Sequence, residues 1–456
     1  MEAKTKTAKR SLWNLFENIE GDKVVWMIVL LLMLISVLCM FSSTSQLLGS
    51  GQSRLDVVKD QLILVAFGIG LVILIYNIRN LNFIMWLSRW GFLLSFALLA
   101  ILDLKVNLGF IRSVEINGAR RIIQVGPVQV HVFEVVKVAM IMYLAWALDA
   151  FKRGTLKGPK KDIWKKILYI YAPFVVTFLM IIPGSNSSAV VIGGMMFITI
   201  LIGGGSIKDL AILIGAGVLM VAGAYAVFAI SDGKVMKRIG TGISRIFDKE
   251  DYEQKVIESR TGSLEYFEAL DKIRQPYSAK IAIHEGGLIG KGPGQSTQRY
   301  VVPDISEDYM FSFIIEEYGI LGGIVVLMLY ISLLARGSII VRNCGNNLFA
   351  KLAVAGLLML IVLQAFLHMF VNCDIGPMTG QTLPLISHGT SAFLCFSVAF
   401  GIILSISRYA SRRMKREQQQ AEPLVERTEV KVELDALDDF ESGKDLTEIM
   451  DQEDEL

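Results

Sequence analysis

The chain has 456 residues, of which 53% are hydrophobic and only 19% are charged, and its formal net charge is +2. Its mean hydropathy is +0.52, and the apolar residues stand in long unbroken runs. Soluble domains carry about 25% charged residues, so this composition excludes a soluble globular enzyme. The small net charge indicates neither nucleic acid nor an acidic partner. The four cysteines lack the spacing of a metal site or a disulfide framework.

Ten segments are long and apolar enough to cross a bilayer, since a transmembrane helix needs about 20 mostly apolar residues. They lie near 23–42, 60–78, 83–104, 132–151, 167–183, 188–204, 208–230, 309–335, 350–372 and 386–407. The sequence therefore predicts an all-α integral membrane protein, a bundle of about ten transmembrane helices with one long loop outside the membrane.

The orientation follows from lysine and arginine, which gather in the cytoplasmic loops of membrane proteins. Basic residues are frequent before the first span, between the fourth and fifth spans and directly after the tenth, and ten spans place all three regions on one face. The acidic tail from about 417 has few large apolar residues and is predicted to be disordered. The predicted parts are a cytoplasmic segment 1–22, seven helices in 23–230, an extracytoplasmic loop 231–308, three helices in 309–407 and a cytoplasmic tail 408–456.

Polar residues at membrane depth are costly and are therefore candidates for function. A first cluster contains Arg120 and Arg121 near the predicted outer surface, followed by Glu134 and Lys137. Arginine binds phosphate groups in a bidentate manner, so the pair predicts a site for a lipid phosphate or pyrophosphate. Anchoring to lipid headgroups is the alternative. Glu134 and Lys137 are three residues apart on one helix face, where they can also simply neutralise each other.

A second cluster joins a glycine-rich stretch, which includes Gly292 and Ser296, to the acids Asp308, Glu316 and Glu317. Glycines allow the backbone to approach a ligand closely and expose N–H groups to anions. The stretch lacks the Gly-Lys-Ser/Thr order of a nucleotide-binding loop. The three acids stand at the start of a predicted span or inside it, which strengthens the interpretation as a binding site.

The third cluster begins on the ninth predicted span, where Gln364, His368 and Asn372 recur every four residues on one helix face. An irregular stretch with Thr382 and Ser387 follows, and such backbone needs protein or water around it at membrane depth. No histidine or cysteine stands at ligand spacing from His368, so a polar contact is favoured over a zinc ligand. Together the three clusters predict an outward-opening cavity for an amphiphile with an anionic head.

Four stretches carry a resemblance to a known family: 117–121 with Glu134 and Lys137, 286–296, 303–319 and 380–387. In these stretches the chain resembles the SEDS family (shape, elongation, division and sporulation), and the likeness extends over residues 20–410. It looks closer to the FtsW members than to the RodA members. The resemblance implies an outer loop after the seventh of ten helices.

The activity implied by the resemblance is peptidoglycan glycosyltransfer, in which lipid II, an undecaprenyl-pyrophosphate-linked disaccharide, is polymerised into glycan strands during cell division. The implied partners are a class B penicillin-binding protein, other divisome proteins, lipid II and membrane lipid, in the bacterial cytoplasmic membrane. A carboxylate base would take the proton of the attacking sugar hydroxyl. Cations, or a divalent metal such as Mg²⁺ or Mn²⁺, would offset charge on the departing pyrophosphate.

The resemblance also implies a catalytic aspartate in the outer loop, six residues before a tyrosine. Counting back from Tyr277 indicates Asp271, whereas counting forward from 245–247 indicates Asp248 or Asp251. The predicted substrate-binding residues are Arg120, Arg121, Glu134, Lys137, Gly292, Ser296, Asp308, Glu316, Glu317, Thr382 and Ser387.

Two other functions remain open on the sequence. A transporter (flippase) of the lipid-linked precursor would explain the polar cavity and would need no catalytic base. A division scaffold without catalysis would use the membrane domain and the acidic tail to recruit partners. The long charged tail and the stretches 316–319 and 380–384 favour the FtsW members, and with them division over elongation or sporulation.

Overall fold

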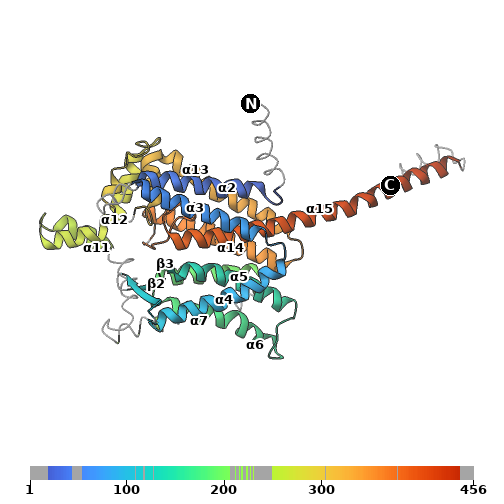
Figure 1. Ribbon diagram of the computed structural model, residues 1–456, viewed down its shortest axis with the longest axis horizontal. Coiled ribbons are helices and arrows are strands. Elements are labelled where there is room, and N and C mark those ends of the chain that lie inside the picture. The colour runs from blue at the N-terminus through green and yellow to red at the C-terminus, as the bar shows by residue number, and fades with distance from the viewer. Residues whose placement is uncertain are drawn as a thin grey trace, which may run out of the picture.

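The protein is a bundle of long helices that run side by side (Figure 1). The computed structural model describes residues 19–43, 54–205, 249–302, 305–376 and 378–441, with the exceptions of 108, 117, 118 and 127. It also describes scattered positions between 206 and 248. The main helices of the bundle are α2 (Lys23–Ser43), α3 (Arg54–Tyr76), α4 (Leu81–Asp103), α5 (Val132–Lys152), α7 (Ala172–Ile181), α8 (Asn186–Ile202), α13 (Met310–Asn343), α14 (Leu348–Asn372) and α15 (Thr390–Glu441). The predicted helical bundle is confirmed, and the predicted span 208–230 lies outside the described residues apart from scattered positions.

Among the described residues, seven helices are long and apolar enough to cross a membrane, and α8 is a shorter apolar helix. α5 carries Glu134, Lys137 and Asp149, yet most of its residues are buried. It packs against α4, α8 and α14, so protein rather than lipid surrounds its charges, which is how membrane helices tolerate them. The chain has the architecture of a multi-pass membrane protein, as predicted.

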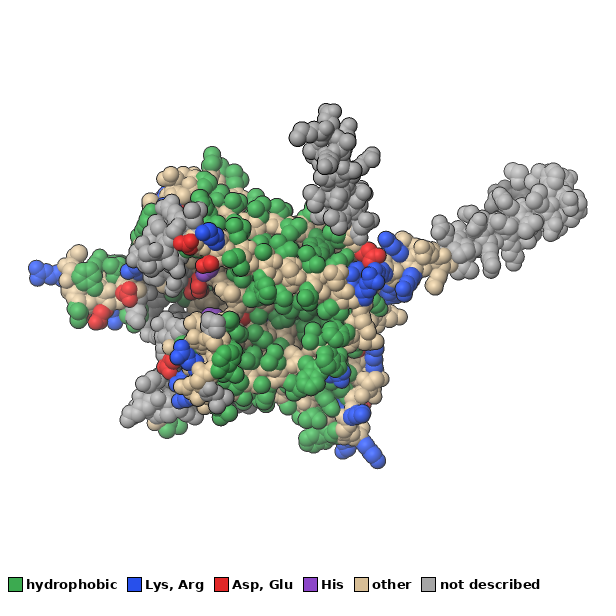
Figure 2. Space-filling model, in the orientation of Figure 1, with side chains coloured by type: hydrophobic (Ala, Val, Ile, Leu, Met, Phe, Trp, Pro, Cys, Tyr) green, Lys and Arg blue, Asp and Glu red, His purple; other side chains and the backbone are tan. Residues whose placement is uncertain are grey.

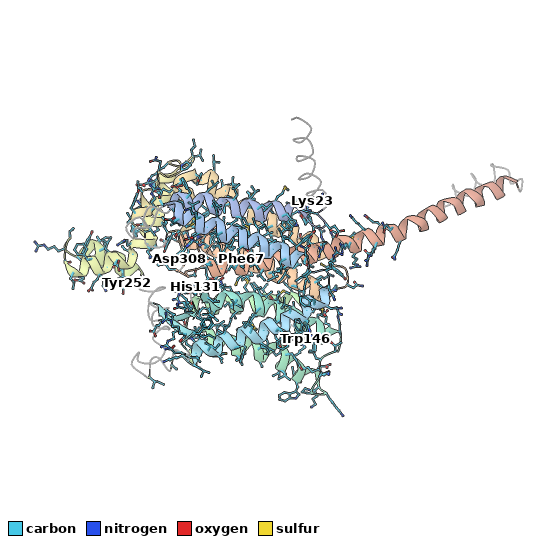
Figure 3. The ribbon with its side chains drawn as sticks, viewed as in Figure 1. Lys23, Phe67, His131, Trp146, Tyr252 and Asp308 are labelled. Atoms are coloured by element: carbon cyan, nitrogen blue, oxygen red, sulfur yellow. The ribbon has the colours of Figure 1, made fainter. Side chains whose placement is uncertain are left out.

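The two ends of the bundle differ in composition. α2 begins at one end, where α15 extends away from the bundle and where α6 (Asp162–Lys166) leads through the π-helical turn η2 (Ile167–Tyr171) into α7 (Figure 1). Lysine and arginine gather at this end, and hydrophobic side chains cover the middle of the bundle (Figure 2). His131 and Asp308 lie toward the opposite end from Lys23 (Figure 3). The basic segments predicted after the fourth and tenth spans thus lie at the same end of the bundle, while most of the segment before the first span lies outside the described residues.

A three-stranded antiparallel sheet, which the sequence did not predict, connects α4 to α5. Its strands are β1 (Ile111–Ile116), β2 (Ala119–Val125) and β3 (Val128–His131), in the order β1-β2-β3. β2 is rich in β-branched residues and pairs with both neighbours, as expected for a central strand. The long apolar runs on either side dominate the hydropathy and conceal these short strands.

The predicted outer loop also contains more helix than its charge and glycine content indicate. It contains α11 (Lys249–Glu258), α12 (Leu264–Gly286) and the short 3₁₀ helix η3 (Gln298–Tyr300). α12 begins at Ser263, whose side chain accepts a hydrogen bond from the amide of Tyr266, a typical helix N-cap. α12 packs against α13, so this helix continues the bundle beyond the apolar spans.

The prediction of a disordered tail from about 417 is wrong as far as Glu441, because α15 continues to that residue. Charge lowers the hydropathy of this segment, but Glu, Lys, Arg, Gln and Ala are also strong helix formers. The same helix begins at Thr390 rather than at the predicted 386, because residues 381–389 have an irregular backbone.

Candidate functional site

Lys137 is the centre of the first polar cluster. It lies on α5, is 2% exposed, and donates from Nζ to Glu134 Oε1 at 2.6 Å and to the side-chain oxygens of Gln364 and Gln381, each at 2.9 Å. Three acceptors satisfy the three donors of an ammonium group, and Glu134 balances its charge. The Glu134 side chain keeps 16% of its surface exposed, so this cluster can still reach a ligand.

The polar face of α14 meets the first turn of α13. His368 Nε2 accepts a hydrogen bond from the amide of Phe311 at 3.3 Å, and Asn372 Oδ1 accepts one from the amide of Ser312 at 2.9 Å. These side chains satisfy amides that a helix start leaves without partners. His368 Nδ1 lies 2.7 Å from the carbonyl oxygen of Gln381. The interpretation of His368 as a polar contact is confirmed.

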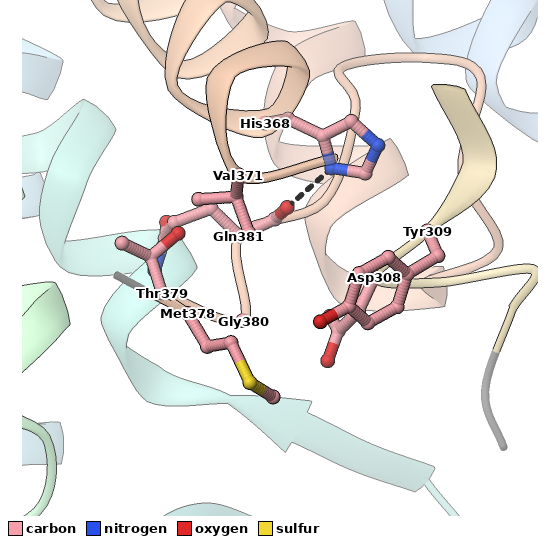
Figure 4. Close-up of a pocket in the computed structure, with 8 residues that line it drawn as sticks. All are labelled: Asp308, Tyr309, His368, Val371, Met378, Thr379, Gly380 and Gln381. Atoms are coloured by element: carbon pink, nitrogen blue, oxygen red, sulfur yellow. Dashed lines mark hydrogen bonds between the residues drawn. The ribbon is translucent and has the colours of Figure 1, made fainter. Parts of the chain in front are cut away.

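A small pocket, partly open to solvent, adjoins these contacts. Asp308 and Tyr309, at the start of α13, face the loop segment with Gly380 and Gln381 across it (Figure 4). The residues that line it are Asp308, Tyr309, His368, Val371, Met378, Thr379, Gly380 and Gln381. Gln381 contacts both Lys137 and His368, so the pocket and the Lys137 cluster are neighbours. Gln381 lies in the stretch 380–387 that carries the family resemblance, but it was not among the predicted site residues.

Thr382 and Ser387 belong to the irregular segment beside this pocket. The side-chain amide of Gln364 donates to the carbonyl of Thr382 at 3.0 Å, and Ser387 Oγ accepts from the amide of Leu383 at 2.9 Å. Tyr330 donates its hydroxyl proton to the carbonyl of Pro384 at 2.6 Å. In the structure, Thr382 and Ser387 thus hold the loop in shape, and their role in substrate binding stays a prediction.

The predicted arginines lie on β2. Arg120 Nε contacts Glu115 Oε2 on β1 at 3.2 Å. β3 is held against the start of α15, where Ser391 Oγ accepts from the amide of His131 at 3.0 Å. Burial lowers the pKa of His131; the charge of Glu134 opposes this shift, and the charges of Arg121 and Lys137 add to it. The sheet therefore brings Arg121 and His131 within electrostatic reach of the Lys137 cluster.

Glu316 lies within the second predicted cluster and is fully buried. It accepts hydrogen bonds from Lys291 Nζ at 2.8 Å, from the amides of Thr297 at 2.7 Å and Gln298 at 3.2 Å, and from the hydroxyl of Ser296. These donors all belong to the loop that follows α12. The structure brings Glu316 and Ser296 together as the sequence predicted, and the two side chains form a hydrogen bond with each other.

Glu317 is 1% exposed and ties the same loop to α2. It accepts from Ser42 Oγ at 2.6 Å and from the amide of Gly294 at 3.0 Å, while Arg299 Nη1 donates to the carbonyl of Ser42 at 2.9 Å. Gly292 has a φ of 101° in this loop, a conformation that glycine adopts readily. Binding of substrate by these residues stays a prediction.

The structure describes the three candidate base residues to different extents. Asp271 is exposed on α12, Asp251 lies in α11 without a described side chain, and Asp248 lies outside the described residues. Arg274 donates to the carbonyl of Val301 at 2.7 Å, and Lys280 forms an ion pair with Asp374 beyond the end of α14. These contacts hold α12 at the end of the bundle toward which Asp308 and His131 lie, and the choice of base stays a prediction.

The pocket offers a divalent cation one carboxylate, that of Asp308. Mg²⁺ is usually bound by one or two carboxylates together with waters and substrate phosphates, so Asp308 would hold such a cation beside a bound pyrophosphate. Among the described residues, no group of three or more His, Cys, Asp or Glu side chains could hold a metal ion. Within the described residues, the protein therefore supplies no complete set of metal ligands by itself.

Comparison with known proteins places this geometry in context. Residues 22–412 match the family model described as cell cycle protein, which covers FtsW, RodA and SpoVE. Stage V sporulation protein E of Bacillus subtilis (strain 168) is 26% identical over 393 residues, 85% of this chain and 97% of that protein. The probable peptidoglycan glycosyltransferase FtsW of Enterococcus hirae is 27% identical over 413 residues, 89% of this chain and 96% of that protein.

Two solved structures share the fold at low sequence identity. The rod shape determining protein RodA of Thermus thermophilus aligns with a TM-score of 0.55 at 19% identity, over 86% of this chain and 98% of that chain. A chain from a peptidoglycan synthase complex, studied for its coordination of polymerization and crosslinking, aligns with a TM-score of 0.61 at 20% identity, over 86% of this chain and 98% of that chain. Each alignment thus covers most of this chain and nearly the whole of the solved chain.

Proposed function

The chain belongs to the family of cell cycle proteins that comprises FtsW, RodA and SpoVE, and on this premise we propose that it is a peptidoglycan glycosyltransferase that polymerises lipid II during cell division. The observation that carries the proposal is the pocket at Asp308 and Tyr309 beside the partly open Glu134–Lys137 cluster. Relatives that are similar over most of their length are named as probable peptidoglycan glycosyltransferases, which supports it.

The proposed chemistry is a substitution at the anomeric carbon of the donor sugar. The hydroxyl oxygen of the acceptor sugar forms the new bond to that carbon, and the bond from the carbon to the pyrophosphate oxygen breaks. Undecaprenyl pyrophosphate leaves with the bonding electrons, and a loop carboxylate, Asp271 in our proposal, takes the hydroxyl proton. Arg120 and Arg121 on β2 would bind the pyrophosphate through charge-assisted hydrogen bonds.

We further propose that the protein lies in the bacterial cytoplasmic membrane with segments 1–22 and 408–456 inside and 231–308 outside. The gathering of lysine and arginine at the end of the bundle where α6 and the extension of α15 lie supports this orientation (Figure 2). Its proposed partners are a class B penicillin-binding protein, which supplies the crosslinking activity, and other divisome proteins. The relative in a complex for polymerization and crosslinking supports the first of these.

The decisive experiment is polymerisation of labelled lipid II by the purified protein, with and without the penicillin-binding partner. Glycan strands are expected, and Asp271→Asn should abolish them, since a general base contributes about a hundred- to ten-thousand-fold in rate. Asp248→Asn and Asp251→Asn should be milder. Loss of activity in one of these two, with Asp271→Asn near normal, would move the base to that residue.

The same preparation separates the proposal from its alternatives. Near-normal polymerisation in all three aspartate variants would remove the loop carboxylate from the mechanism. Exchange of labelled lipid II between the leaflets of vesicles, without polymer, would favour the transporter. A chain that does neither but still binds division partners would favour the scaffold.

Orientation is tested by thiol labelling of single cysteines in a variant without native cysteines. Lys160→Cys lies in the basic loop before α6, and Glu265→Cys lies at the start of α12, and both positions are exposed. In intact spheroplasts an impermeant reagent should label position 265 and not position 160. The reverse pattern would invert the proposed orientation.

A further inference from the structure

α13 is interrupted at Gly319, whose φ of 73° and ψ of −179° lie outside the helical region. In an unbroken helix, the amide of Ile320 would donate to the carbonyl of Glu316, and that of Leu321 to the carbonyl of Glu317. The interruption therefore leaves two donors and two acceptors without helical partners. Unpaired backbone groups are costly in a membrane protein, so these four groups need partners from elsewhere.

The stretch 287–292, directly after α12, supplies all four partners. The hydrogen bonds are Lys291 N to Glu316 O (2.9 Å), Gly292 N to Glu317 O (2.9 Å), Ile320 N to Gly287 O (2.9 Å) and Leu321 N to Leu288 O (3.3 Å). The loop thus takes the place of the missing turn of α13. We call the paired segments 287–292 and 316–321 the backbone joint.

The backbone joint explains why this region is rich in glycine. A Cβ atom at Gly286 would lie 2.1 Å from the carbonyl oxygen of Ile315, and one at Gly319 would lie 2.2 Å from that of Leu288. A Cβ atom at Gly290 would lie 2.3 Å from the carbonyl oxygen of Glu317. All three neighbours are backbone atoms, which cannot move aside as a flexible side chain can.

The two carboxylates reinforce the same joint. Glu316 accepts from loop donors between 291 and 298, and Glu317 accepts from Gly294 and from Ser42 on α2. Both side chains are buried, Glu316 at 0% and Glu317 at 1% exposure. Together they join the loop after α12 to α13 and to α2, as structural anchors do.

The segment 310–318 is therefore held at both ends. His368 and Asn372 bind the amides of its first turn, and the backbone joint holds its last residues. Asp308 and Tyr309, which line the pocket, stand directly before this segment, and α12 ends directly before the joint. A shift of the joint would move both the pocket and the helix that carries Asp271.

We infer that the backbone joint positions the pocket of Asp308 and Tyr309 relative to α12, and that Glu316 serves the reaction as a positioning residue rather than as a substrate ligand. The joint is inferred from the hydrogen bonds alone, and its kinetic consequence rests on the proposed function. A positioning residue should affect turnover, whereas a ligand of the ground-state substrate should affect binding.

The test uses the full-length purified protein with three variants. Glu316→Gln weakens the side-chain anchor, Gly319→Ala disrupts the joint itself, and Gly70→Ala is the control, because Gly70 lies in α3 and a Cβ atom added there would meet no atom within 4 Å. Hydrogen exchange of peptides covering 287–298 and 316–321 reports the joint directly. Exchange should rise about ten- to a hundred-fold in the first two variants and stay unchanged in Gly70→Ala.

Kinetics with labelled lipid II then assign the role of Glu316. In Glu316→Gln, kcat should fall at least about tenfold while KM changes less than about twofold. A raised KM with unchanged exchange in 287–298 would make Glu316 a substrate ligand and overturn the inference. If Glu316→Gln does not fold, Ser296→Ala removes one donor to Glu316 and should give the same pattern at smaller size. A wild-type protein without polymerase activity would refute the proposed function, while the exchange data would still test the joint.

Discussion

The two buried acidic clusters of this protein look alike in sequence and differ in structure. Glu134 pairs with Lys137, two glutamines complete the shell of the ammonium group, and the Glu134 side chain stays 16% exposed. Glu316 and Glu317 are adjacent acids with almost no exposed surface, and loop amides, hydroxyls and Lys291 surround them. The first cluster can still accept a ligand, whereas the second is saturated by the protein.

Polar residues are costly in a membrane bundle, and the difference shows that they serve two distinct roles in this protein. A fully buried cluster that joins several elements holds them together, and a cluster that keeps exposed surface beside a pocket is a candidate site. The hydrogen-bond partners decide the matter, since residue type and membrane depth are similar in both. The following variants test that division, in order of expected effect.

The largest effect is expected for Lys137→Met. Removing the ammonium group leaves Glu134 as a nearly buried charge without its partner, which costs about 3–5 kcal/mol. Thermal unfolding in a fixed detergent should show this loss. The double variant Lys137→Met/Glu134→Gln removes both charges and should recover most of the stability but no polymerisation. A double variant as unstable as the single one would contradict the charge-balance explanation.

The saturated cluster is tested by two glycines of the same loop. Gly290 and Gly294 both have positive φ, at 91° and 79°, so alanine costs about 1–2 kcal/mol at each. Only Gly290 also meets backbone, since its added Cβ would lie 2.3 Å from Glu317 O, whereas the nearest atom to that of Gly294 is 4.0 Å away. Gly290→Ala should therefore be less stable than Gly294→Ala by a further 1–3 kcal/mol or so. Equal unfolding temperatures would argue against a tight joint.

The open cluster is tested at the sheet beside it. Arg120→Ala should weaken lipid II binding by about 1.5–3 kcal/mol, the contribution of a hydrogen bond to a charged group, and should leave membrane insertion intact. Arg112→Ala on β1 is the matched control, because Arg112 contacts the neutral side chain of Gln124 at 3.0 Å. The readout is polymerisation at limiting lipid II. Equal activity of both variants would remove the proposed pyrophosphate contact.

The smallest effect is expected at Glu285, which lies at the exposed edge of the saturated cluster. Hydrogen bonds from Lys291 and Thr297 lower the pKa of this carboxyl group. A lowered pKa in the folded state stabilises the protein above the unfolded pKa of about 4.3, and this contribution is lost as pH falls through the folded pKa. Glu285→Gln should lower the unfolding temperature slightly near pH 7, where the contribution is present but small because the pair is exposed, and the difference from the wild type should disappear as the pH falls below about 4. An unchanged acid profile would contradict this assignment.

Much of the candidate site was visible in the sequence as residue type and depth. Glu134, Lys137, His368 and Asp308 stood out because polar groups are rare in apolar spans, and the structure brings their neighbourhoods together. Gln381 escaped selection because a neutral amide in a polar loop gives no such signal. The choice among the loop aspartates also depends on packing, which spacing alone does not contain.

What the sequence by itself determined are the properties that depend on short stretches of chain. Apolar runs reach the length that a bilayer requires, and clustered lysines and arginines mark one face, so the helices and their common ends could be predicted. The tertiary structure alone decided the sheet and the use of each polar cluster. Residues 287–292 and 316–321 pair through backbone atoms that every residue possesses. Only packing reveals that the glycines there admit another chain segment rather than a ligand.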